Sequence, residues 1–143
     1  KEKMEHNIKE LTIINELSLT VGLVMLTIGN FLGGQWANES WGRYWGWDPK
    51  ETWALISIMV YAFVIHTRLI PGLRSKWLFN LLSVIAFGSI MMTYFGVNFY
   101  LVGLHSYASG AQVITPTFIY FTVVGVVVLG VISYWKFRQN YSK

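Results

Sequence analysis

A short stretch of the chain, Trp41–Trp53, combines aromatic, small and charged residues in a pattern that suits ligand binding. It contains four of the seven tryptophans, together with one tyrosine and two glycines. Flat indole rings separated by glycines can form a shallow apolar surface for another flat molecule. Arg43 and Lys50 can pair with carboxylates at the edge of such a molecule. A porphyrin has both flat faces and carboxylates, so the stretch predicts a porphyrin site.

Two ordinary roles compete with ligand binding in this stretch. Tryptophans also gather at membrane interfaces. An interfacial role explains Trp77 and Trp135 well, because each lies beside a lysine. It explains the tryptophans interleaved with glycines less well. The run Asp48-Pro49-Lys50-Glu51 predicts a helix start, with an N-cap, a proline at N1 and a glutamate at N3. Helix capping is therefore the predicted role of Asp48, and contact with a ligand edge is a secondary one.

His66 lies within a long apolar run, where its imidazole could ligate iron. An ionisable side chain inside a membrane span is a candidate functional residue, and histidine is a common axial ligand of haem iron. The alternatives are a neutral histidine bonded to a neighbouring helix and one that reaches water at the interface. Its helical face comprises Thr52, Leu55, Met59 and Ala62, so no polar stripe explains a histidine there. The chemistry of the residue by itself favours neither the functional reading nor these alternatives.

His105 lies in the loop segment Gly103–Tyr107. Most exposed loop histidines have no special role. His105 becomes a candidate because its loop is predicted on the same membrane face as the tryptophan-rich stretch, and a neutral imidazole there could ligate a bound iron. His6, among the charged residues of the N-terminus, carries no such signal.

The composition indicates a membrane protein. Hydrophobic residues make up 54% and charged residues 13% of the 143 residues, and the mean hydropathy is +0.45. Such a chain is too apolar for an ordinary soluble domain. Its net charge of +4 comes from basic residues beside apolar runs, a pattern of membrane topology rather than of nucleic-acid binding. Without cysteine, the chain has no disulfide, thiolate metal site or Cys-x-x-Cys-His haem attachment motif.

The sequence predicts an all-α fold, a polytopic membrane helix bundle of about four spans, in a single domain that covers residues 1–143. A tryptophan-rich loop (Gln35–Glu51) separates the first two spans, and a loop without lysine or arginine (101–115) separates the last two. Pro71-Gly72 should end the second span, and Pro116 should begin the fourth. The predicted spans run from about Leu11 to Gly34, Thr52 to Ile70, Trp77 to Tyr100 and Pro116 to Trp135.

Lysine and arginine are distributed unevenly among the segments outside the spans. Three precede the first span, three lie between the second and third, and three follow the fourth, whereas the tryptophan-rich loop has two and the loop 101–115 has none. Cytoplasmic segments are enriched in these residues, so both termini are predicted on the cytoplasmic side or its equivalent. The two remaining loops are then predicted on the outer side. Because the chain begins with Lys1 rather than methionine, we expect it to be the C-terminal part of a longer protein.

The motif Trp41-Gly42-Arg43-Tyr44-Trp45-Gly46-Trp47-Asp48 and its continuation Pro49–Ile56 resemble the tryptophan-rich WWD signature of the cytochrome c assembly proteins. Taken with Leu104-His105-Ser106-Tyr107, the continuation is most similar to the CcsA/ResC branch, which works in the System II cytochrome c synthase. The resemblance covers nearly the whole chain. One departure is Tyr44, which stands where many relatives carry a further tryptophan.

The resemblance implies that the chain handles haem b as a transported ligand. It implies that His66 holds haem within the bundle and that His105 ligates haem at the outer loop, each as an axial ligand of the iron. A partner outer histidine is expected upstream of the signature, and this chain has no histidine between His6 and His66. The implied haem-binding residues are Trp41, Arg43, Tyr44, Trp45, Trp47, Asp48, His66 and His105.

By the same resemblance, the expected function is to bind haem and present it on the outer face of the membrane for covalent attachment to apocytochrome c. The expected partners are apocytochrome c, a CcsB/ResB-type membrane subunit and the lipid bilayer, and nucleic acid is not expected. The chain would be part of a holocytochrome c synthase complex in a bacterial inner membrane or a plastid thylakoid membrane. Two alternatives stay open: a b-type haem electron-transfer subunit, which requires two facing span histidines where this chain has one, and a non-catalytic membrane scaffold.

Overall fold

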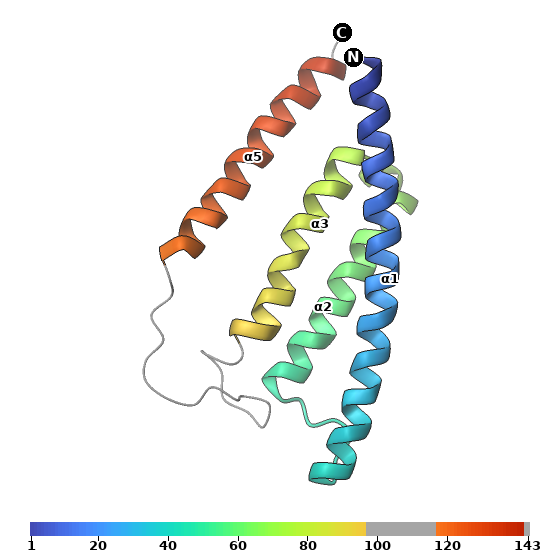
Figure 1. Cartoon of the computed structure of the whole chain (residues 1–143), viewed down its shortest axis with the longest axis vertical. Coiled ribbons are helices and arrows are strands. Elements are labelled where there is room, and N and C mark those ends of the chain that lie inside the picture. The colour runs from blue at the N-terminus through green and yellow to red at the C-terminus, as the bar shows by residue number, and fades with distance from the viewer. Residues whose placement is uncertain (97–116, 142–143) are drawn as a thin grey trace. The chain divides into compact units, whose positions relative to one another are not determined.

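The computed structural model describes residues 1–96 and 117–141, and every regular element within these ranges is helical (Figure 1). The four long helices are α1 (Glu2–Trp41), α2 (Pro49–His66), α3 (Lys76–Met91) and α5 (Thr117–Tyr141). Within the described ranges, four helical segments are long and apolar enough to cross a membrane. The predicted all-α, four-span membrane fold is thereby confirmed, and the chain is a multi-pass membrane protein.

The chain forms two compact units, Lys1–Ser109 and Gly110–Lys143. In the second unit, α5 carries apolar side chains on all of its faces and leaves most of them exposed. A helix of this composition is suited to a surrounding of lipid or of other helices. The prediction that residues 1–143 form a single domain stays a prediction, and the start of the fourth span at Pro116 lies outside the described residues.

The first helix, α1, is longer than the predicted span from Leu11 to Gly34. It has 40 residues, about 60 Å at 1.5 Å per residue, or twice the thickness of a bilayer core. The apolar run marks only the part of a helix that suits lipid, whereas the lysines and glutamates before it are themselves good helix formers. At the other end the helix continues to Trp41, and Gly42 ends it in the left-handed conformation (φ 72°) that favours glycine.

The predicted loop Gln35–Glu51 was wrong at its start, since α1 continues to Trp41, and its last three residues already belong to α2. The non-helical part is the aromatic loop, which we define as residues 42–48. The predicted helix start is confirmed: Asp48 is the N-cap of α2, Pro49 follows it, and Glu51 completes a capping box. The loop is thus short and closed on both sides by helix ends.

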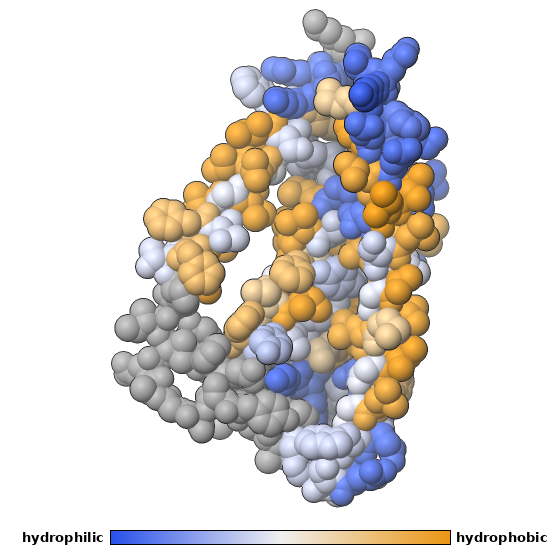
Figure 2. Space-filling view, viewed as in Figure 1, coloured by the Kyte–Doolittle hydropathy of each residue, from blue (hydrophilic) through white to orange (hydrophobic). Residues whose placement is uncertain are grey.

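The first three long helices lie side by side (Figure 1), and α2 packs against both α1 and α3. Their small core consists of Tyr61, Val64, Phe79 and Ala86. Most other large apolar side chains are exposed, and Figure 2 shows them along the middle of α1, with hydrophilic side chains around its N-terminal end. An apolar exterior of this kind is expected where the surrounding solvent is lipid.

Polar contacts also connect the three helices. The Asn15 amide of α1 donates to the side-chain oxygens of Asn80 (2.8 Å) and Ser83 (2.9 Å) on α3. Beyond Met91 the helix continues as the wider turn η3 (Met92–Gly96), where the hydroxyl of Thr93 lies 3.1 Å from that of Ser57 on α2. Hydrogen bonds between spans satisfy polar groups that lipid cannot. The last predicted residues of the third span, 97–100, lie outside the described residues.

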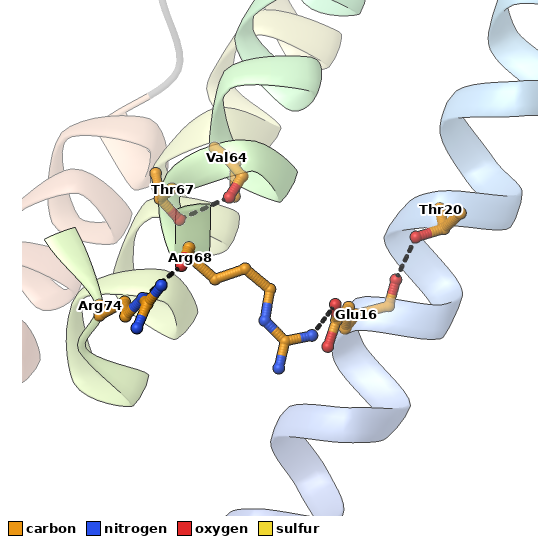
Figure 3. Close-up of polar contacts among 6 residues, drawn as sticks. All are labelled: Glu16, Thr20, Val64, Thr67, Arg68 and Arg74. Atoms are coloured by element: carbon orange, nitrogen blue, oxygen red, sulfur yellow. Dashed lines mark hydrogen bonds and ion pairs between the residues drawn. The ribbon is translucent and has the colours of Figure 1, made fainter. Parts of the chain in front are cut away.

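The end of the bundle opposite the aromatic loop is formed by two short helical turns, η1 (Thr67–Leu69) and η2 (Pro71–Leu73). Figure 3 shows the Arg68 guanidinium extending from η1 to α1, where it pairs with the carboxylate of Glu16. The Nε of Arg74 donates to the carbonyl oxygen of Arg68 (2.9 Å). These contacts fix the turn that follows α2 against α1.

Candidate functional site

Tyr44 attaches the aromatic loop to the side of α1. Its hydroxyl donates to the carbonyl oxygen of Phe31 (3.1 Å). Its ring lies against Gly34, where an added Cβ would come within 2.7 Å of the ring carbon Cζ. The absence of a side chain at Gly34 therefore makes room for the tyrosine. Tyr44 was predicted as a haem-binding residue, and that role stays a prediction; in the structure it anchors the loop to α1.

Glu51 holds the loop from the other side, at the first turn of α2. Its Oε2 accepts hydrogen bonds from the backbone N–H groups of Gly46 (2.9 Å) and Asp48 (3.1 Å). Between these two residues, Trp47 adopts a left-handed backbone conformation (φ 57°), which is unusual for a bulky residue. Asp48 and Glu51 are buried. The two N–H groups thus form a small anion-binding concavity that the glutamate of the same chain occupies.

The tryptophans form two perpendicular pairs. The rings of Trp45 and Trp47 lie 5.6 Å apart at 90°, and those of Trp36 and Trp41 lie 5.0 Å apart at 76°. Such edge-to-face pairs stabilise one another by about 0.5–1.5 kcal/mol beyond the burial of their area. The pairs offer ring faces and ring edges rather than one flat row of coplanar faces. Trp47 is 68% exposed, so its indole projects outward from the loop.

The two predicted cations lie in different surroundings. The Arg43 guanidinium covers Gly46 so closely that an added Cβ there would overlap it, and Arg43 is half-buried. The Lys50 ammonium lies 5.9 Å from the centre of the Tyr94 ring of η3. Arg43 therefore packs on the loop itself, whereas Lys50 lies where α2 and η3 meet.

An open groove of about 370 Å³ runs from the aromatic loop along α1. This volume is within the range of small-molecule sites. One wall is α1, and the others are the loop, the start of α2 and η3. We call it the loop groove, and its lining residues are Met25, Leu26, Gly29, Asn30, Gly33, Gly34, Ala37, Tyr44, Trp45, Lys50, Glu51, Ala54 and Thr93.

His66 lies at the opposite end of α2, as the last residue of that helix, and its side chain is exposed. Its Nδ1 is 2.6 Å from the carbonyl oxygen of Ala62. Since a carbonyl oxygen can only accept, Nδ1 carries the hydrogen, and in the neutral ring Nε2 keeps its lone pair. A hydrogen bond of this kind orients an imidazole for metal ligation through its other nitrogen.

The structure thus separates the predicted site residues into two places. Tyr44, Trp45 and Trp47 lie in the aromatic loop, with Trp41 at the end of α1, whereas His66 is 18 residues beyond Asp48. At 1.5 Å per residue this is about 27 Å along α2. His105 and the loop that carries it lie outside the described residues.

Sequence reasoning missed three residues of the site: Gly34, Asn30 and Trp36. Gly34 receives the ring of Tyr44, Asn30 lines the loop groove, and Trp36 pairs with Trp41. A detectable signal existed, because Gly29, Gly33 and Ala37 repeat at four-residue spacing and leave one face of the helix bare. Such a face lets another structure approach the backbone.

Comparison with known proteins matches residues 1–105 to the family described as "Cytochrome C assembly protein". The chain is 63% identical over 110 residues to protein NrfI of Wolinella succinogenes, a match that covers 77% of this chain and 12% of NrfI. It is 48% identical over 101 residues to the cytochrome c biogenesis protein CcsA of Prochlorococcus marinus strain NATL1A, covering 71% of this chain and 32% of CcsA.

A second CcsA protein, from Synechococcus sp. strain CC9605, is 48% identical over 99 residues, with 69% of this chain and 32% of CcsA covered. The chain therefore spans about a third of each of these CcsA proteins and about an eighth of NrfI. The family match includes the aromatic loop, the loop groove and the three helices around them. This multi-pass membrane protein accordingly belongs to the cytochrome c assembly protein family and is of the CcsA type.

Proposed function

We propose that this chain binds haem at its aromatic loop, on the outer side of the membrane, and presents it for covalent attachment to apocytochrome c. Haem is the substrate in this proposal and not a resident cofactor. The observation that carries the proposal is the outward indole of Trp47, which is held in a strained backbone conformation between two N–H groups bound by Glu51. Strain at a fixed, exposed aromatic residue is typical of functional loops.

The residues of the loop and groove fit the needs of a haem. The exposed indole of Trp47 offers an apolar ring for contact with a porphyrin face. Beside it, the loop groove has an apolar floor along α1 and a cation, Lys50, near its start. Holding haem in this way exposes its edge, so that a second protein can approach it.

The attachment reaction needs orientation more than chemical catalysis by the protein. A cysteine thiol of apocytochrome c adds across a vinyl double bond of haem, its sulfur bonding to one carbon and its hydrogen passing to the other, so that no atom is lost. Fixing both reactants in a productive geometry accelerates such an addition. In this proposal the aromatic loop fixes haem, and apocytochrome c supplies the thiols.

The two histidines act at separate stations. His66 ligates haem b within the membrane through Nε2, which the hydrogen bond of Nδ1 to Ala62 leaves available. His105 ligates the iron at the outer loop. The other haem contacts are those implied by the resemblance, at Trp41, Arg43 and Asp48, although the packing of Arg43 and the capping by Asp48 favour structural roles for both.

The proposed setting is a System II cytochrome c synthase in a bacterial inner membrane or a plastid thylakoid membrane, with the aromatic loop on the periplasmic or lumenal side. A CcsB/ResB-type subunit is the proposed membrane partner, and the chain acts as part of that complex. The CcsA relatives support this assignment, since they are cytochrome c biogenesis proteins.

The test uses the protein in a host that lacks its own cytochrome c synthase. Trp47→Ala and Trp45→Ala should lower both the haem absorption of the purified protein and the amount of covalent cytochrome c. Trp135→Ala is the control matched to Trp47→Ala, because Trp135 is as exposed as Trp47 but lies in α5. Normal haem content and normal cytochrome c in both loop variants would exclude the proposed role of the loop.

A further inference from the structure

The side chain of Asn30 has surroundings that aromatic stacking does not explain. It lies in the apolar part of α1, is half-buried and lines the loop groove. Asn15, on the same helix, donates to Asn80 and Ser83, whereas the carboxamide of Asn30 makes no hydrogen bond within the described residues. A polar group without a partner is costly in a membrane span, so a group that binds in the groove would satisfy it.

The floor of the loop groove beside Asn30 is bare backbone. A Cβ added at Gly29 or Gly33 would meet nothing within 4 Å beyond its chain neighbours and the backbone of its own helix. The neighbouring wall residues Met25, Leu26 and Ala54 are apolar. An apolar ring can therefore approach the backbone of α1 at these two glycines.

Two charged side chains line the same groove, Lys50 and Glu51. One oxygen of the Glu51 carboxylate already accepts two backbone N–H groups, which disperse its negative charge. Among the described lining residues Lys50 carries the positive charge, and its ammonium lies near the Tyr94 ring. An amide donor and a cation above an apolar floor are complementary to a flat ring that carries a carboxylate.

We propose that the loop groove binds the carboxylate-bearing edge of the porphyrin, with the Asn30 amide and the Lys50 ammonium as donors to its carboxylates. This inference rests on the proposed function, since the ligand is the same haem, and it adds the groups by which the site recognises that ligand. Asn30 is a binding residue in this account, and it distinguishes a porphyrin with free carboxylates from one whose carboxylates are blocked.

The experiment compares haem with its dimethyl ester, in which both carboxylates are blocked, by titration of the protein purified from membranes. The unaltered protein should bind haem about tenfold more tightly than the ester, as expected when a charged hydrogen bond is lost. Asn30→Leu and Lys50→Met should each weaken the binding of haem and leave the binding of the ester unchanged. The preference of the protein for haem over the ester should therefore fall in both variants.

Two glycine variants keep the test decisive if Asn30→Leu fails to fold. Gly29→Leu should fill the groove and weaken the binding of both haem and its ester. Gly22 is equally open but lies outside the groove, so Gly22→Leu should weaken the binding of neither ligand. Equal binding of haem and ester by the unaltered protein would overturn the role of the carboxylates while leaving haem binding intact. If Gly29→Leu left the binding of both ligands unchanged, the groove would not be the binding site. If the unaltered protein bound neither haem nor the ester, both this inference and the proposed function would be overturned.

Discussion

The ring of Tyr44 lies directly on Gly34, so that the aromatic loop is fastened to α1 at a point where the helix has no side chain. The contact is tight, since a methyl group at Gly34 would come within 2.7 Å of the ring. The tyrosine hydroxyl adds a hydrogen bond to the Phe31 carbonyl oxygen, one turn earlier. Two residues ten positions apart thus set the path of the chain between the first two spans.

Gly34→Ala should displace the Tyr44 ring and loosen the loop. Overpacking costs about 1–3 kcal/mol, which outweighs the gain of up to about 1 kcal/mol that alanine brings to a helix. Gly22→Ala is the control, because it brings the same gain in helix propensity at a position where the added methyl group meets no neighbouring side chain. Thermal unfolding in detergent should show a lower Tm for Gly34→Ala and an equal or higher Tm for Gly22→Ala. Equal Tm values for both variants would contradict the tight contact.

Glu51→Ala should release the loop from α2. Its carboxylate accepts two backbone hydrogen bonds from Gly46 and Asp48, and their loss should lower the free energy of unfolding by about 2–4 kcal/mol. Glu51→Gln keeps an acceptor oxygen and should lose less. Glu39→Ala, which removes an exposed bond to Gln35, should change stability by less than about 0.5 kcal/mol. Urea titration followed by tryptophan fluorescence measures the free energy of unfolding of all three variants. If Glu39→Ala lost the most stability of the three, the role of Glu51 would be refuted.

The two ends of α2 should face opposite sides of the membrane. Cysteines introduced at Glu39 and Gly72, both exposed, report on the loop end and the opposite end. An impermeant thiol reagent added outside should label Glu39→Cys in intact cells, and should label Gly72→Cys only after the membrane is opened. The basic residues of the turn, Arg68, Arg74 and Lys76, are the physical reason. Labelling of Gly72→Cys in intact cells would invert the predicted topology.

His66 should ligate haem at a different place from the aromatic loop. Two axial nitrogens on one iron lie about 4 Å apart, by analogy with metal–imidazole bonds of about 2 Å, whereas His66 and Asp48 are about 27 Å apart along α2. His66→Ala should therefore remove a haem population that added imidazole restores, as followed by absorption spectra. His6→Ala, which removes only an exposed pair with Glu10, should keep that population. A structure with His66 and His105 on the same iron would exclude separate stations.

Local patterns in the sequence predicted the helices and one of their ends. Long apolar runs allow only helices in a bilayer, because each backbone group must find a partner within its own segment. The Asp48-Pro49-Lys50-Glu51 run predicted the start of α2 correctly, since a capping box is a contact among neighbouring residues. The same reasoning placed the end of the first helix at Gly34 rather than at Trp41, because hydropathy reports where lipid is favourable and not where helical hydrogen bonding stops.

The sequence by itself therefore predicted the four apolar helices, the cap of α2 and, through the tryptophan motif, the kind of ligand to expect. Only the tertiary structure decided that Tyr44 anchors on Gly34 and that Asn30 and Lys50 line one groove. It also showed that Glu51, besides capping its helix, binds the N–H of Gly46. The physical reason is that these relationships depend on how the aromatic loop folds back along α1. That path is set by contacts between separate helices, which the periodicity of a single segment does not contain.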